Sequence, residues 1–170
     1  MTITPGYGLL TTHGGTVDVE EVMARCIELA REALDRGDHP FSSILTKDGQ
    51  IFAEGQNRVN SKFDPTAHAE TEVIREACKA LATLDLSGFT IYASGEPCWM
   101  CGMVIRQVGI ERVVIGGPSR WPTGSYTSSY KILTDEVPER FGPVPEVIIG
   151  VLGAELAALL DSAGWSVPPR

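Results

Sequence analysis

Residues 96–101 read EPCWMC, with two cysteines that stand three positions apart behind a proline. The apolar run before them predicts a buried strand over residues 88–94. A proline is typical of the first turn of a helix, and we predict that helix over residues 97–108. Side chains at positions i and i+3 share one face of a helix, so both thiols can reach a single ion.

Cys98 and Cys101 are compatible with three kinds of site. A redox dithiol also opens a helix, but in a thioredoxin-like chain it follows the first strand and helix, whereas two predicted strands and two predicted helices precede it here. A structural zinc site needs four protein ligands, and no second Cys-x-x-Cys or His-x-x-x-His pair is present. A catalytic metal site needs one more protein ligand and an open position. A thiol redox or metal-binding module remains the alternative of a different class.

The third ligand for a catalytic site is available in DPTAHAE, residues 64–70. Thr66 is expected to cap a helix that runs from residue 67 to about residue 82. His68 and the two cysteines then make a Cys₂His site with its fourth position open to water, which is the arrangement of catalytic zinc. Both predicted helices begin at this site, and helix N-termini favour thiolates.

Glu70 is the candidate catalytic residue. It lies two positions beyond His68, about 200° round an ideal helix, but in a first turn both side chains can pass the helix end and approach a metal. Zinc brings the pKa of a bound water near neutral, and a neighbouring carboxylate can move its proton to a ring nitrogen or a leaving amine. Elsewhere, an acid at this position would only complement the helix dipole.

His68-Ala69-Glu70 followed by Pro97-Cys98-Trp99-Met100-Cys101 resembles the H-x-E…P-C-x-x-C signature of the cytidine-deaminase-like zinc hydrolases. Three longer stretches resemble the branch that holds guanine deaminases, fungal-type cytosine deaminases and tRNA adenosine deaminases: HPFSSILTKDGQIFAEGQNRV, DPTAHAETEVIREAC and IYASGEPCWMCGMVI. The resemblance covers about residues 20–155. It implies an α/β fold of three α-β-α layers, with a five-stranded mixed sheet and helices on both faces. It also implies one zinc ion per chain and a homodimer.

The same resemblance suggests substrate contacts. Asn57 matches the position that hydrogen-bonds the base in this branch, and the main-chain amide of Ala67 is expected near the ring. Phe41, Trp99 and Trp121 can stack on a flat heterocycle, although each is equally compatible with core or interface packing.

The layout of the C-terminal third most resembles guanine-deaminase-like proteins, with two departures. Those enzymes carry acids in the loop after the fourth strand, whereas residues 112–134 contain no Asp or Glu. The tail GWSVPPR, residues 164–170, lacks the pattern expected of a tail that closes a neighbouring subunit's site. We therefore predict hydrolytic deamination of a free base with release of ammonia: guanine or a related purine or pterin first, cytosine second. Adenosine deamination in tRNA is the alternative within the branch.

The composition bears on partners and location. The chain has 170 residues, enough for one core, and its 22 acids against 14 lysines and arginines give a formal net charge of −8. An acidic chain repels phosphate, so the sequence favours a small-molecule base and disfavours nucleic acid as a partner. No apolar stretch reaches the length of a membrane span and residues 1–15 lack a signal-peptide pattern, so we expect a cytoplasmic protein without membrane contact.

Residues 1–17 are expected to form an extended N-terminal segment and residues 18–170 a single zinc deaminase domain. Apolar periodicity and turn residues predict helices over 18–36, 67–82, 97–108, about 127–133 and 153–164, strands over 39–47, 50–59, 88–94, 111–117 and 145–152, a hairpin turn at Asp48-Gly49 and a loop over 60–65. We expect inward-facing side chains at Cys26, Val73, Ile74, Ala77, Cys78 and Leu81, and purely structural roles for His13 and His39.

Overall fold

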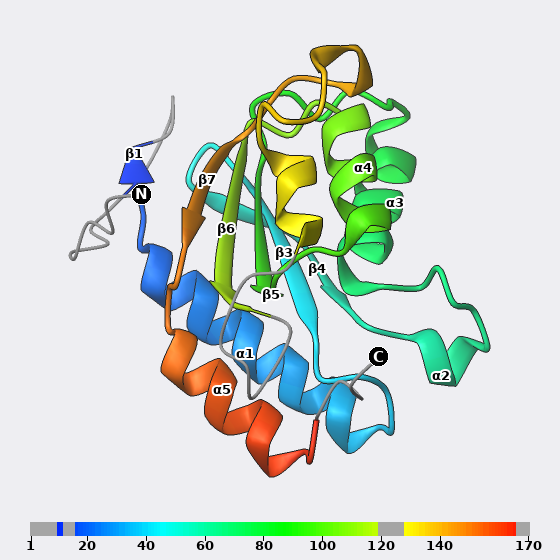
Figure 1. Cartoon of the computed structure of the whole chain (residues 1–170), viewed down its shortest axis with the longest axis vertical. Coiled ribbons are helices and arrows are strands. Elements are labelled where there is room, and N and C mark those ends of the chain that lie inside the picture. Colours follow the sequence, from blue (N-terminus) through cyan, green and yellow to red (C-terminus); the bar gives the residue numbers. More distant parts are fainter. Residues whose placement is uncertain (1–9, 12–15, 119–127, 166–170) are drawn as a thin grey trace.

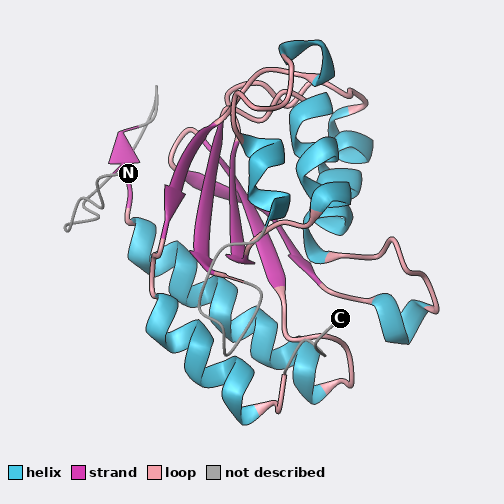
Figure 2. Ribbon diagram, in the orientation of Figure 1, coloured by secondary structure: helices cyan, strands magenta, loops and turns pink. Residues whose placement is uncertain are grey.

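The computed structural model describes residues 10–11, 16–118 and 128–165. Helices cover both faces of a five-stranded sheet, and a separate two-stranded sheet lies at the start of the described chain (Figures 1 and 2). The strands are β1 (Leu10–Thr11), β2 (Thr16–Val17), β3 (Ser42–Lys47), β4 (Gln50–Gln56), β5 (Thr90–Gly95), β6 (Arg112–Gly117) and β7 (Glu146–Ile149). The helices are α1 (Val19–Asp35), α2 (Val59–Lys62), α3 (Ala69–Leu81), α4 (Trp99–Gln107), α5 (Gly153–Ser162) and the 3₁₀ helices η1 (Ser128–Leu133) and η2 (Glu139–Phe141). None of the helices in these parts of the chain has the length and apolar character that a membrane crossing requires.

The five-stranded sheet has the order β4-β3-β5-β6-β7 and is mixed. β3 runs antiparallel to both β4 and β5, whereas β5, β6 and β7 run parallel to one another. Asp48 and Gly49 have φ angles of 50° and 73° and turn β3 directly into β4, as a two-residue hairpin requires. The three-layer α-β-α fold with a five-stranded mixed sheet, which the resemblance implied, is confirmed.

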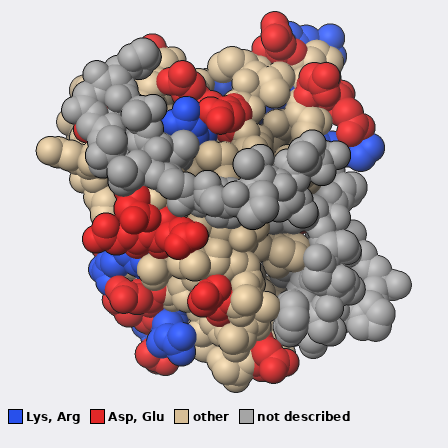
Figure 3. Space-filling model, turned by 90° about the vertical axis from the view of Figure 1, so that its left-hand side faces the viewer, with Lys and Arg blue, Asp and Glu red and all other residues tan. Residues whose placement is uncertain are grey.

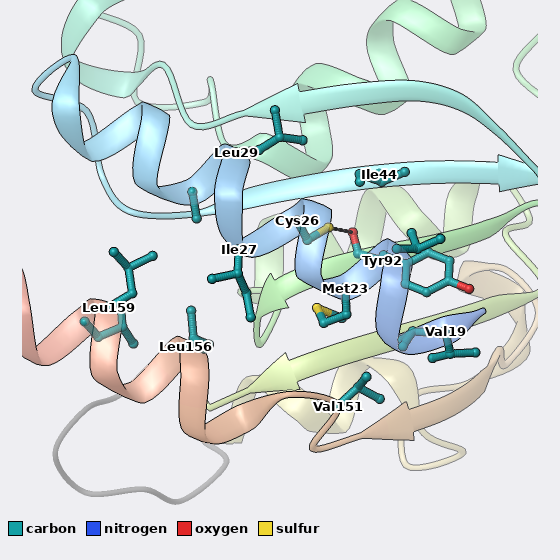
Figure 4. Packing of buried hydrophobic residues seen from close by; sticks show 14 residues of the cluster. Val19, Met23, Cys26, Ile27, Leu29, Ile44, Tyr92, Val151, Leu156 and Leu159 are labelled. Carbon is teal, nitrogen blue, oxygen red and sulfur yellow. Dashed lines mark hydrogen bonds between the residues drawn. The ribbon is translucent and has the colours of Figure 1, made fainter. Parts of the chain in front are cut away.

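One face of the sheet is covered by α1 and α5 (Figure 1). α1 begins at Asp18, whose carboxylate accepts hydrogen bonds from the main-chain amides of Glu20 and Glu21. The core of this layer is made by buried side chains of both helices and three strands, among them Met23, Cys26, Ile27, Ile44, Tyr92, Val114, Leu156 and Leu159 (Figure 4). Cys26 is fully buried there, so its predicted role as a small core residue is confirmed.

The other face is covered by α3, α4 and η1 (Figure 1). Val73, Ile74 and Ala77 of α3 face this core as predicted, and Cys78 is partly buried against it. α3 lies very close to β4, because a Cβ atom at Gly55 would lie only 2.7 Å from the carbonyl oxygen of Ala69. This contact fixes the first turn of α3 against the edge of the sheet.

The two helices with candidate ligands begin later than the sequence predicted. His68 and Cys98 are the N-cap residues of α3 and α4, and both have extended backbone, with ψ angles of 153° and 172°. Thr66 is not the cap of α3. Its main-chain amide and hydroxyl instead donate to the carboxylate of Asp64, which holds residues 64–66 in a turn before the helix.

Three further predictions from the sequence were wrong in detail. Residues 60–65 are not all loop, because α2 forms one helical turn that ends at Phe63 in the left-handed region. Leu81 is 42% exposed, since it is the last residue of α3 and the chain turns away at Ala82. β3 begins at Ser42 because the amide of Phe41 is used in a tight turn with the carbonyl of His39.

Candidate active site

The candidate site lies at one edge of the five-stranded sheet, where several strand ends meet. Ser43 pairs with Ala93, so the start of antiparallel β3 lies beside the end of β5. Phe41 therefore comes just before β3, Asn57 just after β4 and Cys98 just after β5, all at the same edge. A crevice at the carboxyl ends of strands is a common ligand site in open α/β sheets.

His68, Cys98 and Cys101 form a compact triangle at this edge. The distance from His68 Nδ1 to each Sγ atom is 3.6 Å, and the two Sγ atoms are also 3.6 Å apart. Tetrahedral zinc with Zn–S of about 2.3 Å and Zn–N of about 2.0–2.1 Å places its ligand atoms roughly 3.6–3.8 Å apart. The three side chains therefore fit a zinc ion, and within the described residues they are the cluster whose ligand atoms can hold a metal.

The ligand triangle combines two helix N-termini. Neither His68 nor Cys98 uses its side chain to cap its helix, so both side chains are available to the metal. The hydrogen bond with Cys101 and the neighbouring His68 lower the pKa of Cys98 to about 4, although burial opposes the shift. The same hydrogen bond and burial raise the pKa of Cys101. One thiol of the pair is thus already poised as a thiolate, the form that binds metal.

Glu70 is buried in the first turn of α3, with 8% of its surface exposed. Burial raises the pKa of its carboxyl group to about 7; the charge of Cys98 adds to this shift and His68 opposes it. A carboxyl group with a pKa near 7 can both accept and donate a proton at neutral pH. Glu70 lines the same cavity as His68 and Cys98.

A cavity of about 310 Å³ opens beside the ligand triangle. Its lining residues come from the strand ends, the two helix starts and the segment after α5: His39, Phe41, Ser42, Asn57, His68, Glu70, Gly95, Glu96, Cys98 and Trp165. Two candidate substrate contacts from the sequence, Phe41 and Asn57, are thus in the cavity wall. The Asn57 side chain is anchored, because its Oδ1 accepts a hydrogen bond from the amide of Val59.

His39 and Trp165 line the cavity, and the sequence reasoning missed both. Trp165 follows α5, and Gly164, with a φ angle of 60°, turns the chain back toward the sheet. The indole ring lies 4.9 Å from the His39 ring and 5.3 Å from the Phe41 ring, measured between centroids. Burial and the nearby His68 lower the pKa of His39. The Gly164-Trp165 pair at the end of a predicted helix was the only signal in the sequence.

The other predicted substrate contacts have different outcomes. Ala67 is buried, but its main-chain amide donates to the carbonyl of Asp64, so that amide is already used. Trp99 is the first residue of α4 and is 47% exposed. Trp121 lies outside the described residues.

The chain is similar to known deaminases. The chain matches the family described as the cytidine and deoxycytidylate deaminase zinc-binding region over residues 16–117. A tRNA-specific adenosine deaminase of Bacillus subtilis is 36% identical over 143 residues, which cover 84% of this chain and 86% of the relative. A guanine deaminase of the same organism is 47% identical over 83 residues, which cover 48% of this chain and 53% of the relative.

A solved structure of a tRNA:A34 deaminase superposes on the chain with a TM-score of 0.72 at 32% identity, covering 82% of this chain and 99% of its own. The family match contains all three candidate zinc ligands and Glu70. It favours the zinc reading of the Cys-x-x-Cys pair over the redox module. The chain therefore belongs to the zinc-binding cytidine and deoxycytidylate deaminase family, whose members similar to it include tRNA adenosine deaminases and guanine deaminases.

Proposed function

We propose that this protein hydrolytically deaminates a small aminated heterocycle, with guanine or a related purine or pterin as the first candidate and cytosine as the second. The observation that carries the proposal is the cavity of about 310 Å³, which is lined by Glu70, by two of the candidate zinc ligands and by the aromatic side chains of Phe41 and Trp165. This volume is at the small end of the range of about 300–1,000 Å³ for ligand pockets, which suits one flat ring system.

The proposed roles follow from the chemistry of the side chains. His68, Cys98 and Cys101 hold one zinc ion, which lowers the pKa of a water molecule when bound. In the overall reaction a C–O bond forms from water, the C–N bond to the amino group breaks, and ammonia leaves. Glu70 takes one proton from the water and gives it to a ring nitrogen. It then takes the second proton from the new hydroxyl group on the ring carbon and delivers it to the departing amine. Its raised pKa suits both transfers.

The ring itself is proposed to lie between the aromatic walls. Phe41 and Trp165 offer apolar surface to a flat ring. The hydrogen bond from the Val59 amide to Oδ1 of Asn57 holds this side chain in place, and its Nδ2 group is the proposed donor to the ring. Trp99 and Trp121 remain proposed contacts from the sequence alone. The Ala67 amide would serve only if it shared its hydrogen bond with Asp64.

A free base is favoured over a polyanion by the distribution of charge. Many basic side chains in the described parts of the chain already form ion pairs with acids: Arg25, Arg36, Lys62, Arg75, Lys79, Arg112 and Lys131. On the face drawn in Figure 3, lysines and arginines lie beside acids and form no separate basic patch among the described residues. Paired cations release few counterions when a phosphate backbone approaches, so they contribute little to its binding.

Deamination of adenosine in tRNA is the alternative to a free base, and the comparisons favour it. The Bacillus subtilis tRNA-specific adenosine deaminase is similar over 84% of this chain, whereas the guanine deaminase is similar over 48%. The expectation from net charge that nucleic acid is an unlikely partner therefore has no support from relatives. We also propose a homodimer, from the family resemblance, and a cytoplasmic location, where two metal-binding thiols stay reduced.

Ammonia release from a panel of substrates tests the proposal. Zinc-loaded protein is incubated with guanine, cytosine, pterins, their nucleosides where these exist, and a tRNA anticodon stem-loop that carries adenosine. We expect the highest kcat/KM on a free base and lower values on the matching nucleoside. Efficient conversion of adenosine to inosine in the stem-loop, with no ammonia release from free bases, would select deamination of adenosine in tRNA instead.

A further inference from the structure

A glycine lies inside α4, directly after the candidate zinc ligand Cys101. Glycine destabilises the interior of a helix relative to alanine, so its presence there usually has a packing reason. A Cβ atom at Gly102 would lie only 2.1 Å from Cγ2 of Ile132, a fully buried side chain of η1. Ile132 thus occupies the space that any other residue at position 102 would need, and η1 contacts the backbone of α4 at this point.

The backbone at Gly102 is joined to both thiol ligands. Gly102 follows Cys101 in the chain, and its main-chain amide donates to the carbonyl of Cys98 at 2.8 Å. A displacement of residue 102 therefore moves both residues that carry the thiols. The two Sγ atoms are 3.6 Å apart, and a tetrahedral zinc site tolerates only small changes in that distance.

Ile132 is itself held against α4. Its carbonyl accepts a hydrogen bond from the guanidinium of Arg106, which lies one turn beyond Gly102 on the same face of the helix. Its branched side chain has little rotamer freedom. A second close contact follows η2, because a Cβ atom at Gly142 would lie 2.0 Å from the carbonyl oxygen of Arg106. The chain from η1 to the end of η2 thus contacts one face of α4 at two points.

We propose that Gly102 and Ile132 are positioning residues: their contact fixes the first turn of α4 and thereby the geometry in which Cys98 and Cys101 hold zinc. Neither residue belongs to the ligand triangle. The inference gives η1 a role in metal binding through the helix that it contacts. It rests on the zinc ligands named in the proposed function and is independent of which heterocycle is the substrate.

A pair of compensating substitutions tests the inference. Gly102→Ala should weaken zinc binding about tenfold, which is ~1.4 kcal/mol, because the added methyl group displaces the first turn of α4. Adding Ile132→Ala removes both γ carbons and should restore the affinity to within about threefold of the wild type. Adding Ile132→Val instead keeps two γ carbons and should not restore it. Competition with a chromophoric chelator measures the zinc affinity, and the absorption bands of Co²⁺-substituted protein report the ligand geometry.

A matched control separates positioning from loss of stability. Leu159→Ala removes a buried side chain of α5 in the core on the other face of the sheet, so it should keep the zinc affinity and cobalt spectrum of the wild type. Ile132→Ala alone should weaken zinc binding about threefold, and this pair of variants decides the matter if Gly102→Ala does not fold. Wild-type affinity in folded Gly102→Ala, equal rescue by alanine and valine at position 132, or equal zinc affinities of Ile132→Ala and Leu159→Ala would overturn the inference.

The outcomes distinguish this inference from the proposed function. If all variants bind zinc equally and the wild type releases ammonia from a heterocycle, the function stands and the role of Gly102 and Ile132 fails. If zinc affinity follows the compensating pattern but the wild type releases no ammonia from any heterocycle, the positioning role stands and the deaminase proposal fails. A wild-type chain that binds no zinc would overturn both.

Discussion

Two acids in the first turn of α3 have opposite surroundings. Glu72 forms ion pairs with Lys62 and Arg75, two partly exposed side chains that neutralise its charge. Glu70 lies in the cavity beside His68, and burial raises its pKa to about 7. One helix turn therefore contains a candidate proton carrier and a similarly buried carboxylate that has a structural role.

Glu70→Gln is expected to lower kcat by about 10²–10⁴-fold, since the amide keeps the shape of the side chain but cannot transfer protons. Zinc content and fold should be unchanged, because Glu70 is outside the ligand triangle. Glu72→Gln is the matched control and should keep a kcat near that of the wild type. Steady-state ammonia release and metal analysis measure both effects. Near-normal turnover by Glu70→Gln would remove this residue from the mechanism.

The lowered pKa of Asp38 leads to a prediction about how the free energy of unfolding depends on pH. Burial alone would raise the pKa of Asp38, but hydrogen bonds from the Ser61 amide and hydroxyl and from Arg36 lower it below its usual value. A depressed pKa in the folded state means that the stabilisation is present above the unfolded pKa of about 3.9 and is lost as the pH falls through the lower folded value.

Asp38→Asn should therefore lower the free energy of unfolding by about 1–3 kcal/mol at pH 7, which is the range for hydrogen bonds to a charged group. The difference from wild type should begin to shrink below about pH 4, where Asp38 becomes protonated in the unfolded wild-type chain, and should be lost as the pH falls through the lower folded pKa. Urea unfolding at several pH values measures it, with Asp35→Asn, an exposed position at the end of α1, as the control. A difference that stays constant down to pH 3 would show that the charge of Asp38 is not the cause.

At the residue scale, the sequence was most informative where chemistry restricts residue type. Spacing and side-chain chemistry grouped His68, Cys98 and Cys101, and the structure brings their ligand atoms within 3.6 Å of one another. Trp165 and His39 were missed because a tryptophan after a helix and a histidine before a strand have no spacing rule. The contact between these two side chains depends on how α5 and β3 are placed in the fold.

Among the helices and strands, α4 has an unusual anchor. Arg106 is fully buried, and its guanidinium donates to main-chain carbonyls of η1 and of the connection from η1 to β7, including those of Ile132, Val137 and Gly142. The cation thus satisfies carbonyls of an irregular segment that has few regular hydrogen bonds of its own. It ties α4, whose first turn provides both thiols, to the chain that follows.

Arg106→Met is expected to lower the free energy of unfolding by about 2–5 kcal/mol, because several buried carbonyls lose their donor. Arg112→Met is the control: its ion pair with Glu146 is partly exposed, so the loss should be about 0–1 kcal/mol. Chemical denaturation of both variants measures the difference. Similar stability losses for the two variants would mean that the carbonyl cluster finds water or another donor.

The elements themselves could be predicted because their apolar periodicities are strong, and all five strands of the main sheet and its long helices lie close to their predicted positions. Helix starts could not be placed to the residue. His68 and Cys98 have extended backbone at the N-cap positions of α3 and α4. The first residue of each helix depends on the position of these ligands and, for α3, on the hydrogen bonds around Asp64, which no apolar periodicity shows. The single turn of α2 has too few residues to show a period.

For the molecule as a whole, the ligand triangle connects two separate helices. His68 opens α3 and Cys98 opens α4, thirty positions later, so one ion holds together the two helices that cover this face of the sheet. The strand order β4-β3-β5-β6-β7 could not be obtained from periodicity; only the family resemblance implied a sheet of this kind. That the domain spans residues 18–170, with residues 1–17 as an appended segment, stays a prediction.

Zinc removal is expected to lower the melting temperature as well as abolish activity. A ligand that binds only the folded state stabilises it by RT ln(1 + [L]/Kd), about 2.7 kcal/mol at one hundred times Kd. Thermal unfolding with and without a chelator measures this effect. Cys78→Ser should respond to the chelator like the wild type, whereas Cys98→Ser should start at the lower melting temperature and not respond. A chelator-sensitive Cys98→Ser variant with full zinc content would contradict the ligand assignment.

The place of Trp165 in the cavity wall has a practical consequence for kinetics. Indole fluorescence responds to nearby rings, so a heterocycle that enters beside Phe41 should change the emission of Trp165 without any added label. The chain has three tryptophans, and Trp99→Phe with Trp121→Phe leaves this one as the single emitter. Stopped-flow mixing of such a protein would then time ligand arrival and product departure separately from the chemical step.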